Sequence, residues 1–302
     1  MDNKVGQEIR RLRKSLTMTQ ASLCKGICDQ SMISKIEKGE TYPSATILYQ
    51  LAKKLDVDME HFFRFSKIPK PDYVHHFYQL LRKAVREHDY KEVENLIKKE
   101  EHHPVFKQSE LKQVILWHKG MVSYYVYQNF QNAVDFLNQS LAISRSSNEN
   151  RSFSERELEI LNSLAALHAE IEMFEKADKY YMDAWNVLKR KWPLKDPTIY
   201  IRIIYNLSKV KTRLGEKENS IKMCKMGINY CKETNLMYLL GELTYHIGYN
   251  YEVQTEEMEK CIEYYQKAIA IFEVLENEKA IEFIAEKIKK LSINPPFPTP
   301  KI

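Results

Sequence analysis

Glycine and proline are scarce in this chain, and long apolar runs are missing from it. Only 8 Gly and 10 Pro stand among 302 residues, so there is little of the glycine-rich sequence that cradles phosphate groups in nucleotide-binding enzymes. No stretch reaches the roughly 18 consecutive apolar residues of a membrane-spanning helix, and the N-terminus MDNKVGQEIRRLRKSL has no apolar signal segment. We therefore expect a cytoplasmic, mostly helical protein with no membrane partner.

Cysteine usage and charge exclude further classes. No two cysteines stand in a CxxC pair, so the spacing of a zinc site is missing. The 46 basic residues face 41 acidic ones, for a net charge of +5, which permits a nucleic-acid partner without requiring one. No GxSxG, HExxH or Walker motif occurs. We expect no enzyme activity, and no catalytic residue, metal ligand or cofactor. We interpret the five cysteines as reduced core residues: Cys24, Cys28, Cys224, Cys231 and Cys261.

Short amphipathic segments separated by capping residues fill the first 65 residues. Apolar spacing predicts a helix over residues 4–15 with its arginines around the exposed side, and a second helix over residues 20–27. Asp29 can cap a third helix, which Gly39 ends in a left-handed conformation. The expected inward-facing residues of the five helices are Ile9, Leu12, Leu16, Leu23, Ile27, Ile33, Ile36, Leu48, Leu51, Ala52, Leu55, Met59, Phe62 and Phe63.

The second and third of these helices suggest a contact with DNA. A short helix, a tight turn and a second short helix that begins with small polar residues fit a DNA major groove. The turn of such a motif normally carries glycine, and we interpret Ile27-Cys28-Asp29 as a departure in which the small Cys28 is accommodated. The alternative is a five-helix protein-interaction module whose polar face is solvated.

The segment TQASLCKGICDQSMISKIEKGETYPSATILYQLAKKL resembles the phage-repressor-like family of helix-turn-helix domains over its whole length. The resemblance implies that Gln20, at the start of the second helix, contacts a DNA phosphate. It also implies that Gln30, Ser31 and Lys35 read base edges, since Gln suits adenine and Lys suits guanine. Ser34 completes the expected DNA-binding face.

A repeated helical pattern follows. Small, large and small residues recur at offsets of four and three, and the sets start 44, 43 and 41 residues apart, which is longer than the 34-residue tetratricopeptide repeat. This spacing predicts a superhelix of about five degenerate tetratricopeptide-like repeats, whose first helices line a concave wall. The sets are Ala133/Leu137/Ser140, Ala177/Tyr181/Ala184, Ser220/Cys224/Gly227 and Cys261/Tyr265/Ala268.

The chain therefore divides into two all-α parts. We predict a DNA-binding domain over 1–65, a linker over 66–72 that contains two prolines, and a repeat domain over 73–292. A Pro-rich tail is predicted over 293–302, and its stretch Pro295–Pro300 cannot be helical.

This order of domains resembles, over nearly the full chain, the PlcR-like peptide-pheromone-responsive transcription regulators of Gram-positive bacteria. Segments that carry the resemblance are ICDQSMISKIEKGETYPSATIL, YNLSKVKTRL and LLGELTYHIGY. It implies a quorum-sensing regulator of virulence or stress genes, which binds a short oligopeptide in the concave groove. It also implies a homodimer that reads a pseudo-palindromic operator in double-stranded DNA.

The resemblance further implies a peptide clamp. Asn162 and Asn206 lie 44 residues apart and are expected to hold the peptide backbone, because one amide side chain can donate to and accept from a single peptide unit. Glu242 and Tyr245, with Tyr249 beside them, are the expected contacts of the last repeat. The alternatives are ordinary polar wall residues and, for the whole chain, a repeat scaffold that regulates partner proteins without a direct promoter role.

Overall fold

Helices and their connecting turns make up the described part of the chain. The computed structural model describes residues 4–62, 71–145, 153–189, 194–254 and 257–293, and none of them lies in a β-strand. They form two compact units, residues 1–112 and 113–302. Among these residues, no helix is both long and apolar enough to cross a bilayer. The predicted all-α fold is confirmed.

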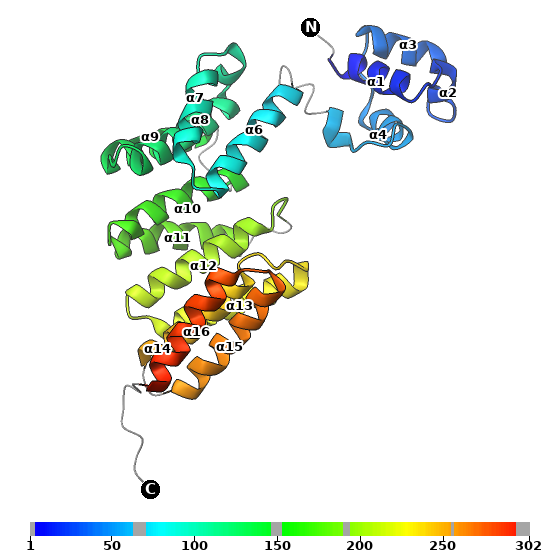
Figure 1. Ribbon diagram of the computed structural model, residues 1–302. Helices are drawn as coiled ribbons and strands as arrows, with labels where there is room; N and C mark the ends of the chain where they lie inside the picture. Colours follow the sequence, from blue (N-terminus) through cyan, green and yellow to red (C-terminus); the bar gives the residue numbers. More distant parts are fainter. Residues whose placement is uncertain (1–3, 63–70, 146–152, 190–193, 255–256, 294–302) are drawn as a thin grey trace. The chain divides into compact units, whose positions relative to one another are not determined.

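The N-terminal helices enclose a small core of their own (Figure 1). Ile9, Leu23 and Ile33 are fully buried in it, as the apolar spacing predicts. The first and third helices cross closely: a Cβ added at Gly6 would lie 1.8 Å from the carbonyl oxygen of Ile36, so only glycine fits there. The helices are α1 (Lys4–Ser15), α2 (Gln20–Cys24), α3 (Gln30–Lys38) and α4 (Ala45–Lys54), followed by a helical stretch at 59–62.

Four expectations for this domain are wrong, and a fifth lies outside the described residues. The second helix ends at Cys24, and Gly26, at φ +79°, supplies the left-handed residue of the turn. The motif therefore carries its usual glycine, at a position that the predicted helix 20–27 covered. Leu16 is 46% exposed, whereas Arg13, expected outside, is 9% exposed. Phe63 is not among the described residues.

A helix pair follows in the same unit. It consists of α6 (Pro71–Arg86) and α7 (Tyr90–Glu100), which pack on each other, and a 3-10 turn follows at Pro104–Lys107. Asp89 caps α7 by accepting a hydrogen bond from the backbone N–H of Glu92 at 3.0 Å. Of the predicted linker, residues 66–70 lie outside the described part of the chain, and residues 71–72 belong to α6.

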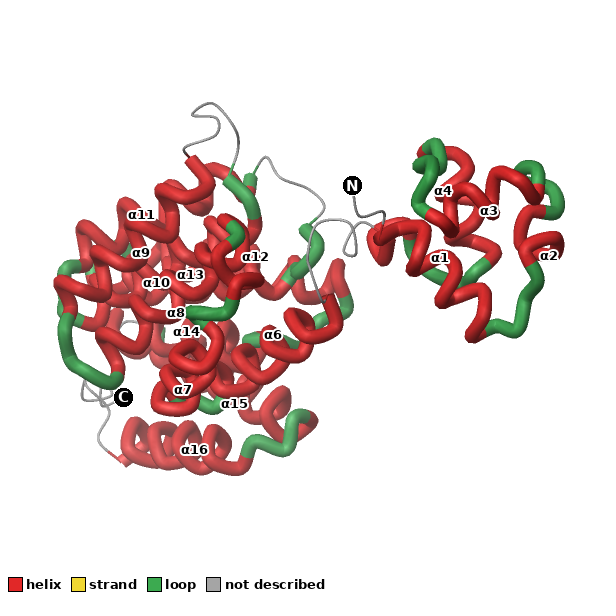
Figure 2. The backbone as a smooth tube through the Cα atoms, turned by 90° about the horizontal axis from the view of Figure 1, so that it is seen from above, coloured by secondary structure: helices red, strands yellow, loops and turns green. Residues whose placement is uncertain are grey.

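Helix pairs continue through the second unit, and Figure 2 shows its helices from above. Within the pairs α10/α11, α12/α13 and α14/α15 the two helices pack on each other, and the first helices of successive pairs also contact one another. The elements are α8 (Ser109–Tyr125), α9 (Phe130–Arg145), α10 (Glu155–Glu170), α11 (Phe174–Leu188), α12 (Thr198–Arg213), α13 (Lys217–Thr234), α14 (Leu240–Gln254), α15 (Met258–Val274) and α16 (Glu278–Ile293).

The recurring small and large residues form the core of these pairs. Every member of the four predicted sets on α9, α11, α13 and α15 is buried. The small members allow the first helices to approach: a Cβ added at Gly227 would lie 2.9 Å from Leu243 Cδ1 on α14. The predicted repeat is therefore confirmed as a packing pattern. Because one side of each first helix packs on the second helices, only the other side can contact a ligand.

Candidate functional site

The exposed face of α3 carries the residues predicted to read DNA. Gln30, Ser31 and Lys35 are exposed, and Ser34 is half-buried. The opposite side of the helix is anchored in the core by fully buried isoleucines and by Glu37. Ser31, Ser34 and Lys35 follow Gln30 by one, four and five residues. This spacing places the four polar side chains on one side of the helix. Their contact with DNA stays a prediction.

Gln20, the predicted phosphate contact, has a partner within the domain. Its Nε2 donates to Glu37 Oε2 at 2.9 Å. The same carboxylate accepts from Arg13 Nε at 2.6 Å and Nη2 at 2.9 Å, and Arg13 Nη1 donates to the Met18 carbonyl. Gln20 thus ties α2 to α3, and its phosphate contact, still a prediction, would come from the backbone N–H groups at the start of α2.

The charge of Glu37 is stabilised by these bonds. Burial alone would raise the pKa of its carboxyl, but the hydrogen bonds from Arg13 and Gln20 outweigh burial, so the pKa lies below its ordinary value of 4.5. The ion pair joins α1 to α3 across 24 residues, and no local sequence pattern indicates it.

The second candidate site is the first-helix wall, by which we mean Asn162 on α10, Arg202, Asn206 and Lys209 on α12, and Tyr245 and Tyr249 on α14. All of them are half-buried or exposed, while the residues between them on these helices are buried, apart from the half-buried Tyr205. Asn206 Nδ2 donates to Asn162 Oδ1 at 3.0 Å. The structure therefore brings together the two residues predicted to clamp a peptide.

The bond between the two asparagines leaves Asn162 Nδ2 as a donor without a hydrogen-bond partner within the part of the chain that is described. Asn206 has a second neighbour, because it also forms a side-chain hydrogen bond with the Tyr181 hydroxyl. The free amide donor is one of the two kinds of group that a peptide unit needs. Nearby, Arg202 Nη1 lies 3.3 Å from Glu159 Oε1 and Arg202 Nε donates to the Tyr238 hydroxyl at 3.2 Å. Sequence reasoning did not single out Arg202.

Tyr245 and Tyr249, the tyrosines on α14 that were predicted to contact the peptide, lie against aromatic and charged side chains. Tyr245 stacks on the buried Tyr265, with ring centroids 5.1 Å apart and an interplanar angle of 11°. Lys287 Nζ of α16 lies 5.7 Å from the Tyr245 centroid and 5.0 Å from that of Tyr249, and it pairs with Glu252 at 2.7 Å. The last helix therefore contacts both tyrosines.

Glu242, the remaining predicted contact, is half-buried on α14 and forms no ion pair within the described part of the chain. Its contact with a peptide, like those of Tyr245 and Tyr249, stays a prediction. Tyr181 and Tyr265, the large members of two repeat sets, are 1% and 0% exposed.

Comparison with known protein families shows to which family the chain belongs. The profile of the RNPP family C-terminal domain matches residues 79–291, more than half of the chain. The chain belongs to the RNPP family. A helix-turn-helix profile matches residues 9–62.

Solved structures share the fold of this RNPP protein. Bacillus thuringiensis PlcR in complex with the peptide PapR7 and DNA superposes with a TM-score of 0.81 at 24% identity, over 93% of this chain and 99% of that one. Apo PlcR gives 0.66 at 23% identity, over 95% and 99%. ComR from S. thermophilus, in complex with DNA and its signalling peptide ComS, gives 0.58 at 19%, over 95% and 99%. The resemblance stated from sequence is confirmed.

A curated relative matches only 64 residues of the RNPP protein. An uncharacterized transcriptional regulator in the ATPase CF(0) region of Rhodospirillum rubrum is 38% identical over 64 residues, which is 21% of this chain. The match spans 59% of that relative's length.

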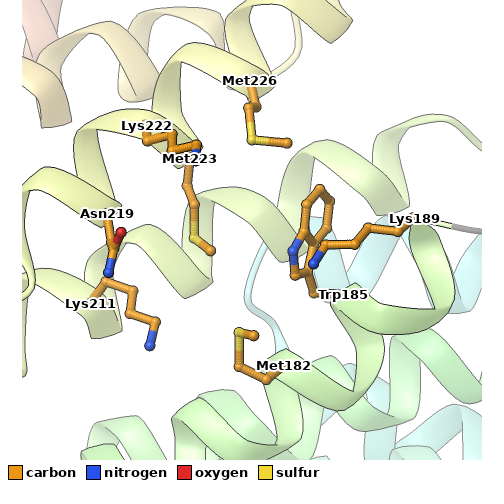
Figure 3. A pocket seen from close by; sticks show the side chains of 8 residues that line it. All are labelled: Met182, Trp185, Lys189, Lys211, Asn219, Lys222, Met223 and Met226. Carbon is orange, nitrogen blue, oxygen red and sulfur yellow. The ribbon is translucent and has the colours of Figure 1, made fainter.

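The RNPP protein also has a hollow of about 340 Å³ outside the first-helix wall. Figure 3 shows Trp185 beside Lys189, whose Nζ lies 5.1 Å from the indole centroid. Lys211 at its edge is neutralised by Asp178 and Glu216, at 2.9 and 3.1 Å. No sequence motif marked this hollow. Its lining comes from α11 with the residue that caps its C-terminus, α12 and α13: Met182, Trp185, Lys189, Lys211, Asn219, Lys222, Met223 and Met226.

Proposed function

We propose that the chain is a sequence-specific DNA-binding transcription regulator controlled by a short signalling peptide, which binds at the first-helix wall. One observation carries the proposal: a single chain joins a helix-turn-helix match over 9–62 to an RNPP C-terminal domain over 79–291. PlcR and ComR, which share the fold, are described as complexes with DNA and a peptide. No feature of the described residues favours the alternative of a scaffold without a promoter role.

The rest of the proposal follows from that role. We place the regulator in the cytoplasm, where DNA and an imported peptide meet, and assign it no catalytic activity. The domain bounds that we propose are 1–65 for DNA binding, 66–72 for the linker, 73–292 for the repeats and 293–302 for the tail. The last two linker residues already belong to α6 and Ile293 ends α16, while 294–302 lie outside the described residues.

Peptide binding can control DNA binding only if the peptide has different affinities for two arrangements of the protein. The test of the proposal is the recovery of a peptide from the native cell. The full-length protein is purified from its own organism and denatured, and the released material is analysed by mass spectrometry. A short peptide present in stoichiometric amount supports the proposal. If repeated preparations release no peptide, and conditioned growth medium leaves operator binding unchanged, peptide control is refuted.

Base reading by α3 makes a specific prediction for Lys35. Lys35→Ala should relax base preference at one operator position and cost about 1 to 3 kcal/mol against the correct base, because a cationic donor to a base edge is lost. Gln20→Ala should weaken binding to all sequences alike, because the lost hydrogen bond to Glu37 no longer fixes the start of α2, whose backbone N–H groups would hold a phosphate, and phosphate contacts carry no sequence information.

Binding to a randomised operator library, read by sequencing, measures both effects, and Lys53→Ala, an exposed lysine in the last turn of α4, is the matched control. A uniform loss with Lys35→Ala would contradict base reading.

We also propose a homodimer, because a two-fold symmetric protein reads a pseudo-palindromic operator with two copies of the same helix. Light scattering at micromolar concentration should then give twice the chain mass of 35.8 kDa. The operator complex should contain two protein chains. A monomer in both measurements would remove dimerisation from the proposed mechanism.

A further inference from the structure

Lys209 is a cation on the first-helix wall without a compensating acid. Its side chain is exposed, and within the described part of the chain it forms no ion pair and no hydrogen bond. Its Nζ lies 5.4 Å from the ring centroid of Tyr205, one turn earlier on α12. Arg202, on the same helix, differs because Glu159 neutralises it.

The charged groups around Lys209 form no ion pair with it within the described residues. Glu170, at the end of α10, attracts Lys209 from a distance, and its Oε1 accepts a hydrogen bond from the Tyr125 hydroxyl at 2.5 Å. Arg213 of α12 repels Lys209. On α14, His246 is neutral near pH 7, since burial lowers its pKa to about 4, and it lies 3.0 Å from Thr212 Oγ1.

The surroundings disfavour the charged form of Lys209 in part. Although the side chain is exposed, desolvation of its ammonium group by nearby protein atoms is the main cause that lowers its pKa, and Arg213 adds to it, while Glu170 opposes it in part. A partly desolvated cation gains more from an anionic ligand than one in open water, because the effective dielectric is lower.

The position of Lys209 relates it to the asparagine pair. Asn206 and Lys209 are three residues apart on α12, so their side chains lie on one side of the helix, about 5 to 6 Å apart at Cβ. A peptide unit held by Asn162 and Asn206 would thus present its neighbouring group to the Lys209 ammonium.

We propose that Lys209 recognises a carboxylate of the bound peptide, so that the signal is an acid-bearing peptide whose acidic group lies next to the backbone unit held by the two asparagines. This inference rests on the proposed function and specifies its ligand class. The carboxylate belongs either to an Asp or Glu side chain or to the peptide C-terminus, and the test separates these two sources.

The experiment uses the full-length protein and defined peptide mixtures. The first mixture contains randomised heptapeptide amides with Glu fixed at one position in turn, and the second is identical with Gln in its place. A third has random neutral residues and a free C-terminal carboxylate. Peptides retained by the protein are quantified by mass spectrometry after size exclusion.

We expect one of the two acidic mixtures to be enriched roughly tenfold over the Gln amide mixture, because a charge-assisted hydrogen bond is gained. Lys209→Met, which keeps the length of the side chain, should abolish this preference, and Lys209→Arg should retain it. Lys222→Met is the matched control: Lys222 is also an exposed lysine, but it lies on α13 at the hollow, and its loss should leave the preference intact. Thermal melts of the three variants verify folding.

The outcomes are distinguishable. If the wild type retains no peptide from any mixture, both peptide binding and this inference fail. If peptides are retained equally from acidic and neutral mixtures, or if Lys209→Met keeps the acidic preference while it folds normally, the inference fails and peptide binding stands. Enrichment of the Glu mixture assigns the carboxylate to a side chain, and enrichment of the third mixture assigns it to the C-terminus.

Discussion

Glu37→Ala is expected to lower the free energy of unfolding of the N-terminal domain by about 3 to 5 kcal/mol, because it leaves a buried cation without its partner. Glu37 is 4% exposed and Arg13 is 9% exposed. The carboxylate accepts two hydrogen bonds from Arg13 and one from Gln20. Without it, the described contacts of the Arg13 guanidinium reduce to the Met18 carbonyl.

Denaturant unfolding of residues 1–112, one of the two compact units, and of the full chain measures this loss. Glu40→Ala is the matched control, since Glu40 is an exposed acid shortly after α3 and its removal should change stability by less than about 0.5 kcal/mol. A double variant, Arg13→Met with Glu37→Met, should recover much of the loss, because a well-packed apolar pair replaces a buried ion pair at little cost. Equal losses for Glu37→Ala and Glu40→Ala would show that the ion pair does not hold the domain together.

The same ion pair gives the domain a pH dependence. The pKa of Glu37 is lower in the folded state than its ordinary value of 4.5, so its contribution to stability is present above that value and is lost as the pH falls through the folded-state pKa. In Glu37→Gln this part of the acid dependence should disappear. Because Glu37 lies on α3, loss of the pair should also weaken operator binding under conditions where the domain is still largely folded.

The features that could be predicted well from the sequence are those in which a residue pattern repeats along the chain. The sets such as Ala177/Tyr181/Ala184 recur because each helix pair buries the same side, so spacing alone identified them. The turn glycine was missed because the apolar Ile27 extended the second helix in the pattern, whereas Gly26 at φ +79° ends it. Amphipathic spacing likewise places every arginine outside, and it cannot show that Arg13 meets an acid 24 residues away.

The residues of the candidate sites also differ in how far sequence patterns could identify them. Asn162 and Asn206 could be selected from their spacing together with the family resemblance, and the structure places them in contact. Lys209 carried no motif, and its significance comes from what surrounds it on α10 and α14. The contact of Lys287 with Tyr245 joins helices α14 and α16, which no pattern within one repeat specifies.

The contact between the two asparagines changes what their replacement should do. Asn162→Ala and Asn206→Ala are each expected to cost about 1 to 3 kcal/mol of peptide affinity, because peptide N–H and C=O groups are left unpaired. Since Asn206 Nδ2 donates to Asn162 Oδ1, each amide fixes the orientation of the other. One replacement therefore already impairs both, and the double variant should lose less than the sum of the single losses, by about 0.5 to 3 kcal/mol.

Calorimetric titration of the peptide that co-purifies with the protein, into wild type, both single variants and the double variant, measures this coupling. Folding should be nearly unchanged, because both side chains are only half-buried, and thermal melts check it. Asn186→Ala is the matched control, an exposed asparagine on the second helix α11, and should leave affinity unchanged. Additive losses would mean that the two amides bind independently. Unchanged affinity in both single variants, with intact melts, would place the peptide away from the asparagine pair, and the position of Lys209 beside it would then have no role in recognition.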